Sequence, residues 1–116
     1  MQIGCRPLAI DESTPGLVIV GTEFANGSGY LLVQLPGEGD EGDWFGADHY
    51  VEVNDQHHGQ YGGIKTLEVG KDSLIFTLSG AADLFGEPIE LVFSEPMADE
   101  AVNKLSLIGS ANYGKS

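Results

Sequence analysis

Residues 17–35, LVIVGTEFANGSGYLLVQL, decide the fold class, because they contain two apolar, β-branched runs with a turn sequence between them. Asn26-Gly27 lies in that turn, and Asn-Gly is a strong hairpin signal since both residues tolerate positive φ. We therefore expect an antiparallel strand pair in this part of the chain.

Further strand signals lie on both sides of this hairpin. Residues 49–54 alternate in polarity, which places Tyr50 and Glu52 on one face of a strand and Val51 and Val53 on the other. The predicted strands are residues 2–10, 17–24, 29–35, 49–54, 64–69, 73–78 and 88–94. The predicted loops include residues 36–48 and 54–63.

A helix is predicted near residues 96–108, towards the end of the chain. Ser94 offers an N-cap, and Pro96 suits the first helical turn. Gly109 is the expected stop, and residues 110–116 form an expected frayed tail. Apolar residues at spacings of four, four and three form a core-facing stripe, namely Met97, Ala101, Leu105 and Ile108.

A series of strands followed by one helix predicts an α+β fold. We expect a mostly antiparallel β-sheet of five to seven strands, with the C-terminal helix packed on it. The length of 116 residues suits a single domain spanning residues 1–116 around one hydrophobic core. The expected core residues are Val18, Val20, Leu32, Val51, Val53, Leu67, Leu74, Phe76, Leu91, Phe93, Ala101 and Leu105.

The charge of the chain is strongly acidic and unevenly placed. Eighteen acidic residues against five basic ones give a formal net charge of −13, and no Lys or Arg occurs between Pro7 and Ile64. Such a charge opposes binding to nucleic acid or to an anionic membrane, both of which require basic residues. It suits a basic protein partner, or serves only to keep the protein soluble.

The candidate partner-binding surface lies around the acidic loop. Trp44 and Phe45 follow the densest acidic run, where they would act as interface anchors or fold back as a cap on the core. Gly62 and Gly63 are predicted to form a tight turn into strand 64–69, with positive φ at one of them. The candidate partner-binding residues are Glu38, Asp40, Glu41, Asp43, Trp44, Phe45, Asp48, Tyr50 and Tyr61.

No complete catalytic motif occurs in the sequence, which predicts a protein that is not an enzyme and has no cofactor and no metal. An EF-hand frame starting at Glu41 fails because Phe45 occupies a ligand position. His57 and His58 are adjacent, and neighbouring side chains of an extended chain point in opposite directions, so they rarely share one ion. Cys5 is the single cysteine, which excludes an intrachain disulfide.

The apolar runs are too short to cross a bilayer, and the N-terminus lacks the basic and apolar regions of a signal peptide. We therefore expect a cytoplasmic protein.

Three segments of the sequence resemble the immunity protein 10 family of bacterial polymorphic-toxin systems. They are HYVEVNDQ at residues 49–56, YGGI at residues 61–64 and the strand SLIFTL at residues 73–78, within a resemblance that covers about residues 45–108. The resemblance implies a cytoplasmic protein that binds and neutralises a cognate toxin domain, without catalysis. It does not identify the toxin, although a basic nuclease would complement the acidic surface.

A second interpretation stays open beside this one. The chain would then be a small acidic intracellular domain that acts as a homo-oligomer or as a protein-interaction module. Neighbouring genes would distinguish the two, because an adjacent gene for a secreted protein with a C-terminal toxin domain supports immunity.

The acidic loop carries a testable prediction about association kinetics. Replacing Asp40, Glu41 and Asp43 together by Asn, Gln and Asn should slow association with the toxin domain and flatten its salt dependence, because long-range attraction is screened by salt. Replacing Trp44 or Phe45 by Ala should instead speed dissociation, by an amount equivalent to about 2 kcal/mol, if these side chains are anchors. Surface plasmon resonance at two salt concentrations measures both rates. Unchanged association of the triple variant at low salt would leave solubility as the only role of the loop.

Overall fold

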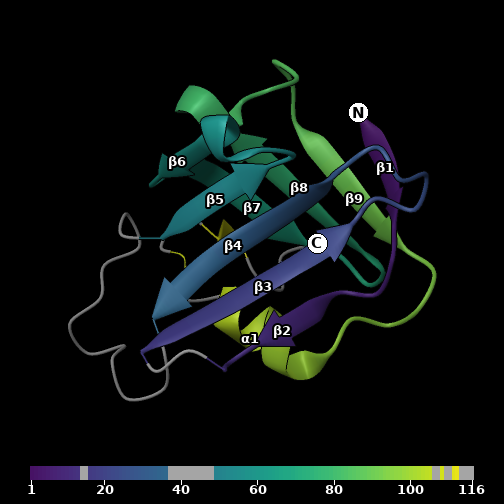
Figure 1. Ribbon diagram of the computed structural model, residues 1–116. Helices are drawn as coiled ribbons and strands as arrows, with labels where there is room; N and C mark the ends of the chain where they lie inside the picture. Colours follow the sequence, from purple (N-terminus) through teal and green to yellow (C-terminus); the bar gives the residue numbers. More distant parts are fainter. Residues whose placement is uncertain (14–15, 37–48, 106–107, 109–110, 113–116) are drawn as a thin grey trace.

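The computed structural model describes residues 1–13, 16–36, 49–105, 108 and 111–112, which form two β-sheets and a short α-helix. The two sheets lie one in front of the other in Figure 1, with the helix below them. The expected α+β class is therefore confirmed, whereas the expectation of one sheet of five to seven strands is wrong. A single sheet would leave one face of the apolar strands in water, and a second sheet buries that face.

The first sheet has the strand order β1-β9-β8-β7-β10. Its central strands β7, β8 and β9 are antiparallel, while β1 lies parallel to β9 and β10 lies parallel to β7. The two parallel pairs make this sheet mixed. Its strands are β1 (Gln2–Cys5), β7 (Ile64–Val69), β8 (Ser73–Leu78), β9 (Ile89–Phe93) and β10 (Ala111–Asn112).

The second sheet has the order β2-β3-β4-β5-β6 and is antiparallel throughout. The hairpin expected around Asn26-Gly27 joins β3 to β4, and Gly27 has a φ of 78°. Its strands are β2 (Ala9–Asp11), β3 (Leu17–Glu23), β4 (Tyr30–Pro36), β5 (Tyr50–Val53) and β6 (Gly59–Tyr61).

The hydrophobic core lies between the two sheets, and alternate residues of each strand face it. Eleven of the twelve expected core residues are buried, and Leu32 is the exception. In β4 the core-facing residues are instead Leu31, Val33 and Leu35. The run from Tyr30 to Val33 is apolar without a break. Its polarity pattern therefore does not indicate which of the two alternating sets of side chains faces the core.

The helix α1 (Asp99–Leu105) begins five residues after Ser94 and is shorter than the 96–108 segment expected. It contacts the strands β2 and β3 at one end of the sandwich. The predicted apolar stripe is correct nevertheless, since Ala101, Leu105 and Ile108 are buried and Met97 packs against the core. Only Ala101 and Leu105 of this stripe lie within the helix, which has about two turns, and the preceding residues link it to β9.

Two segments expected to be irregular form regular structure. Residues 54–63 contain a short 3-10 helix, η3 (Gln56–His58), and then β6. Residues 111–112 form β10 within the expected frayed tail. The short strands β6 and β10 lie at the edges of their sheets, and β10 pairs with β7, which is distant in sequence. A second 3-10 turn, η4 (Gly80–Ala82), follows β8.

The chain passes from the second sheet to the first at residues 61–64, and His49 holds this crossing. The carbonyl oxygen of His49 accepts a hydrogen bond from the Gly62 nitrogen at 2.7 Å, and its Nε2 accepts one from the Ile64 nitrogen at 3.0 Å. The Gly63 carbonyl oxygen accepts a hydrogen bond from the Ser79 nitrogen at 2.8 Å. Backbone groups that leave one sheet are therefore paired before they join the next.

The two glycines of the crossing are required for different reasons. Gly62 has a φ of 65°, which confirms the predicted positive φ in this turn. Gly63 allows close approach, since a Cβ there would lie 2.8 Å from Val51 Cγ1 and 2.9 Å from Gln60 Cβ.

Replacing Gly62 by Ala should lower the free energy of unfolding by about 1 kcal/mol or more, because a Cβ destabilises the left-handed conformation. Gly4→Ala is the matched control, since Gly4 lies in β1 and an added Cβ would meet nothing within 4 Å. Urea unfolding followed by circular dichroism measures both variants. Equal stability of the two variants would contradict the role given to the turn.

Candidate partner-binding face

The second sheet has a surface turned away from the core, which we call the outer face. Strand register determines its members, because directly opposed residues of paired strands point to the same side. Gly21 opposes Ala9 and Leu32, Leu32 opposes Glu52, and Tyr50 opposes Tyr61. The outer face comprises Ala9, Asp11, Ile19, Gly21, Glu23, Tyr30, Leu32, Gln34, Tyr50, Glu52, Gly59 and Tyr61.

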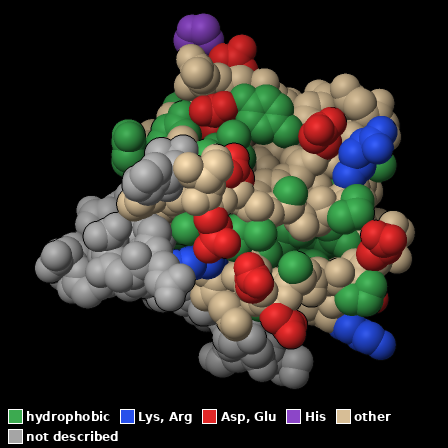
Figure 2. Space-filling model, turned by 60° about the horizontal axis from the view of Figure 1, so that its bottom comes forward, with side chains coloured by type: hydrophobic (Ala, Val, Ile, Leu, Met, Phe, Trp, Pro, Cys, Tyr) green, Lys and Arg blue, Asp and Glu red, His purple; other side chains and the backbone are tan. Residues whose placement is uncertain are grey.

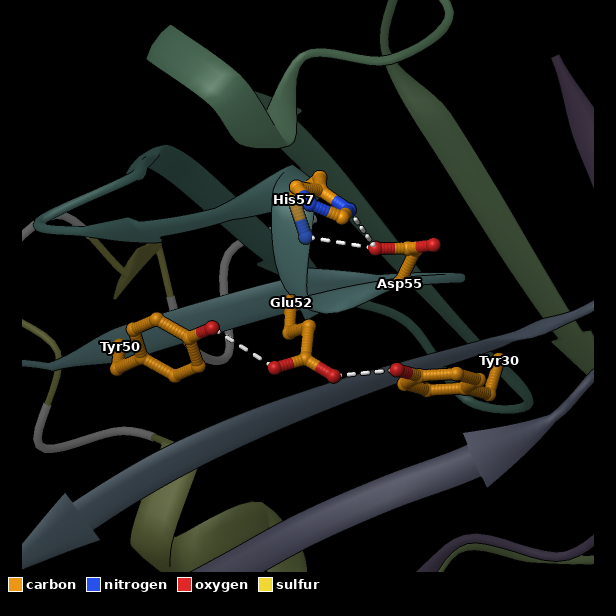
Figure 3. Close-up of polar contacts among 5 residues, drawn as sticks. All are labelled: Tyr30, Tyr50, Glu52, Asp55 and His57. Carbon is orange, nitrogen blue, oxygen red and sulfur yellow. Dashed lines mark hydrogen bonds and ion pairs between the residues drawn. The ribbon is translucent and has the colours of Figure 1, made fainter.

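Glu52 lies between two tyrosines on the outer face (Figure 3). Its Oε1 accepts a hydrogen bond from the Tyr50 hydroxyl at 2.7 Å, and its Oε2 accepts one from the Tyr30 hydroxyl. Glu52 is only 8% exposed although it points away from the core. Burying a carboxylate is costly unless its oxygens are hydrogen-bonded, so the two hydroxyls are what make this position tolerable for Glu52.

Glycines make room for the side chains that build this cluster. A Cβ on Gly59 would lie 1.8 Å from the Tyr50 hydroxyl oxygen, so only glycine lets Tyr50 lie across β6. A Cβ on Gly29 would lie 1.8 Å from Asn54 Oδ1, the atom that accepts a hydrogen bond from the Tyr30 nitrogen at 3.0 Å. The positions of both tyrosines thus depend on glycines in neighbouring segments.

The cluster raises the pKa values of both tyrosines above their ordinary value of 10. The hydrogen bond to Glu52 is the main reason that the pKa of Tyr30 rises to about 12, and partial burial and the charge of Glu52 add to it. For Tyr50, burial is the first cause of a pKa of about 12, followed by the hydrogen bond to Glu52. Both phenols therefore stay protonated as donors to the carboxylate through neutral pH.

Tyr61 extends the cluster toward the edge of the sheet. It is 70% exposed, and its ring centroid lies 5.0 Å from that of Tyr50, with 55° between the ring planes. A tilted aromatic pair of this kind is favourable, and it keeps a large apolar surface in contact with water. Exposed aromatic rings with a polar tip are typical of protein interfaces.

A hollow of about 700 Å³ lies beside Tyr30 on the same side of the sheet. Figure 2 shows it with hydrophobic and acidic side chains around it. The hollow exists because Ala9 and Gly21 are small and lie opposite each other in β2 and β3. Its other lining residues include Arg6, Pro7, Asp11, Ile19 and Glu23.

Polar residues outside the outer face serve local structure. The Asp55 side chain caps η3, where its Oδ1 accepts hydrogen bonds from the His57 nitrogen at 2.7 Å and is 2.8 Å from His57 Nδ1. These contacts lower the pKa of Asp55, the backbone hydrogen bond from His57 contributing most. Among the residues that the structure describes, no three His, Cys, Asp or Glu side chains are grouped as metal ligands would be.

Cys5 is buried at the end of β1, and burial raises the pKa of its thiol despite opposing hydrogen bonds that involve Thr22 and Val92. It therefore belongs to the core. Within the described part of the chain, no helix combines the length and the apolar character needed to cross a membrane.

The structure brings together two of the sequence-predicted partner-binding residues, Tyr50 and Tyr61, on the outer face. The other seven lie in residues 37–48, outside the described residues. Tyr30 and Glu52 were not among the predicted site residues. Alternation in residues 49–54 already placed Glu52 beside Tyr50, whereas only strand pairing could bring Tyr30 to them.

Comparisons of this chain with protein-family models, with curated proteins and with solved structures find no match.

The raised pKa values of Tyr30 and Tyr50 give a prediction about their titration. Each phenol has a higher pKa in the folded state than in the unfolded state, so it stabilises the fold below pH 10, and this contribution is lost as the pH rises from 10 to about 12. Glu52→Gln removes the negative charge and should lower the pKa of Tyr30 more than that of Tyr50, whose shift comes first from burial. Titration of ¹³Cζ-labelled tyrosine by NMR measures both values.

Glu68→Gln is the matched control, because Glu68 lies exposed on β7 in the first sheet. It should leave both tyrosine titrations where they are. An unaltered Tyr30 titration in Glu52→Gln would show that the carboxylate does not control this phenol.

Proposed function

We propose that this chain is an immunity protein that binds and neutralises a cognate toxin domain, and that the outer face of the second sheet is its binding surface. The observation that carries the proposal is the combination on this face of exposed aromatic surface, a hollow and acidic side chains. Interfaces are commonly anchored by tyrosines in this way, and catalysis plays no part in the proposal.

The segments that carry the family resemblance support the choice of the outer face as the binding surface. In the segment HYVEVNDQ, Val51 and Val53 are buried in the core, whereas Tyr50 and Glu52 face outward. Tyr61, which begins the segment YGGI, packs against Tyr50. A purely structural motif would need the valines and glycines but not this outward cluster.

Charge supports a basic partner. The chain carries a net charge of −13, and the strands of the second sheet, from Ala9 to Tyr61, contain no Lys or Arg. Such a surface attracts a basic protein and accelerates encounter with it. A nuclease toxin has a basic surface for its phosphate substrate, and an acidic protein bound there would exclude that substrate. We accordingly place the protein and its target in the cytoplasm, as the resemblance implies.

The alternative of a homo-oligomer or a general interaction module has less support from this face. Two copies joined through their outer faces would bring Asp11, Glu23 and Glu52 of each copy near those of the other. Like charges in contact are destabilising, so self-association through this surface is disfavoured.

Coexpression with candidate toxin domains encoded by neighbouring genes tests the proposal. The unaltered chain should restore growth and bind the purified toxin domain in isothermal titration calorimetry. Tyr61→Ala should weaken binding by about 2 kcal/mol or more, because it removes the most exposed anchor of the outer face.

Thr66→Ala serves as the control, since Thr66 is exposed on β7 in the other sheet. It should bind as the unaltered chain does. Growth arrest in the presence of the unaltered chain, with no heat of binding, would refute the proposed function.

A further inference from the structure

The Glu52 carboxylate is buried without a counter-charge. Among the described residues, no Lys, Arg or His forms an ion pair with it, and its only hydrogen-bond partners there are the hydroxyls of Tyr30 and Tyr50. A hydroxyl stabilises a carboxylate but does not neutralise it. The carboxyl group therefore lies at a site that is 8% exposed, and within the described residues only hydroxyls contact it.

The chain has little means of supplying that counter-charge itself. It contains five Lys and Arg residues, and none of them lies between Pro7 and Ile64, which includes the whole second sheet. Arg6 is the cation nearest to this sheet in sequence; it lines the hollow but forms no ion pair within the described residues. Within the described part of the chain, no cation is paired with Glu52, which leaves this position open to a cation from a partner.

The surroundings of Glu52 suit an arginine guanidinium better than a lysine ammonium. A carboxylate can accept four hydrogen bonds, and the two hydroxyls occupy one position on each oxygen. A planar guanidinium can fill the remaining positions in a bidentate pair and can stack on an aromatic ring. The rings of Tyr30 and Tyr50 flank the carboxylate (Figure 3). Tyr61 packs beside Tyr50. A lysine ammonium would be attracted by the charge of the carboxylate but would not stack on the tyrosine rings.

We propose that Glu52, held between Tyr30 and Tyr50, is the receptor for an arginine side chain of the protein partner, and that the adjoining hollow holds the segment next to that arginine. This inference rests on the proposed function and names the chemistry of the partner. The hollow suits a segment with a small apolar residue, because Ile19 and Ala9 supply apolar lining. Asp11 and Glu23 outnumber Arg6 in that lining, so its charge is negative on balance.

The side chains of this cluster are held in place by contacts within the protein. Hydrogen bonds already fix both oxygens of Glu52, and Gly59 and Asn54 determine where the two tyrosines lie. Side chains ordered before binding lose little further entropy when the partner arrives. A charged hydrogen-bonded pair formed in such a site contributes mainly to slow dissociation, whereas exposed acids contribute mainly to association.

Surface plasmon resonance with the purified toxin domain as the probe tests the inference. Glu52→Gln should weaken binding about thirtyfold or more, mostly through faster dissociation. Glu68→Gln makes the same change in net charge on the other sheet and should leave dissociation unchanged. Tyr50→Phe keeps the ring and the Glu52 charge while removing one hydroxyl, so it should weaken binding less than Glu52→Gln does.

Single Arg→Ala replacements across the toxin domain complete the experiment. One of them should be strongly non-additive with Glu52→Gln and additive with Glu68→Gln, and Arg→Lys at that position should restore binding only in part. Thermal unfolding of each variant separates loss of binding from loss of fold.

The outcomes distinguish this inference from the proposed function. No binding by the unaltered chain overturns both. Normal binding that is unaffected by Glu52→Gln, or the absence of any toxin arginine coupled to Glu52, overturns the arginine receptor and leaves the immunity function standing.

Discussion

The crossing of the chain from one sheet to the other is the constraint on which the rest of the structure depends. Two sheets can enclose a common core only if the connecting backbone stays hydrogen-bonded where it is buried. His49 meets that need with two acceptors. Its carbonyl oxygen accepts a hydrogen bond from the Gly62 nitrogen, and its Nε2 accepts one from the Ile64 nitrogen. The crossing also sets where β6 ends, and so brings Tyr61 beside Tyr50 on the outer face.

The outer face of the second sheet contains a buried carboxylate, that of Glu52, which does not by itself stabilise the fold. Among the residues that the structure describes, no cation pairs with the Glu52 carboxylate, and the hydroxyls of Tyr30 and Tyr50 offset part of the cost of burying it. Burying an apolar residue at position 52 would cost less free energy than burying a carboxylate. Retaining Glu52 with two tyrosines and the glycines that admit them is understandable if the face binds something basic.

The candidate site was only partly accessible from the sequence. Alternation in residues 49–54 placed Tyr50 and Glu52 on one side of a strand, and charge counting identified an acidic surface. Neither signal could include Tyr30, because it reaches Glu52 through the pairing of β4 with β5. The hollow was equally hidden, since it arises from small residues that face each other on β2 and β3.

Local sequence patterns predict most strand positions, the apolar stripe of the C-terminal segment and the glycine turn before Ile64, and they show a long acidic stretch without basic residues. These properties depend on neighbours within a few residues, where polarity period and backbone preference act directly. Tertiary structure alone decided that the strands divide into two sheets, that β1 and β10 pair in parallel with β9 and β7, and that Leu31 rather than Leu32 faces the core. These features follow from contacts between segments distant in the chain, and a local pattern carries no information about which distant surface will cover it.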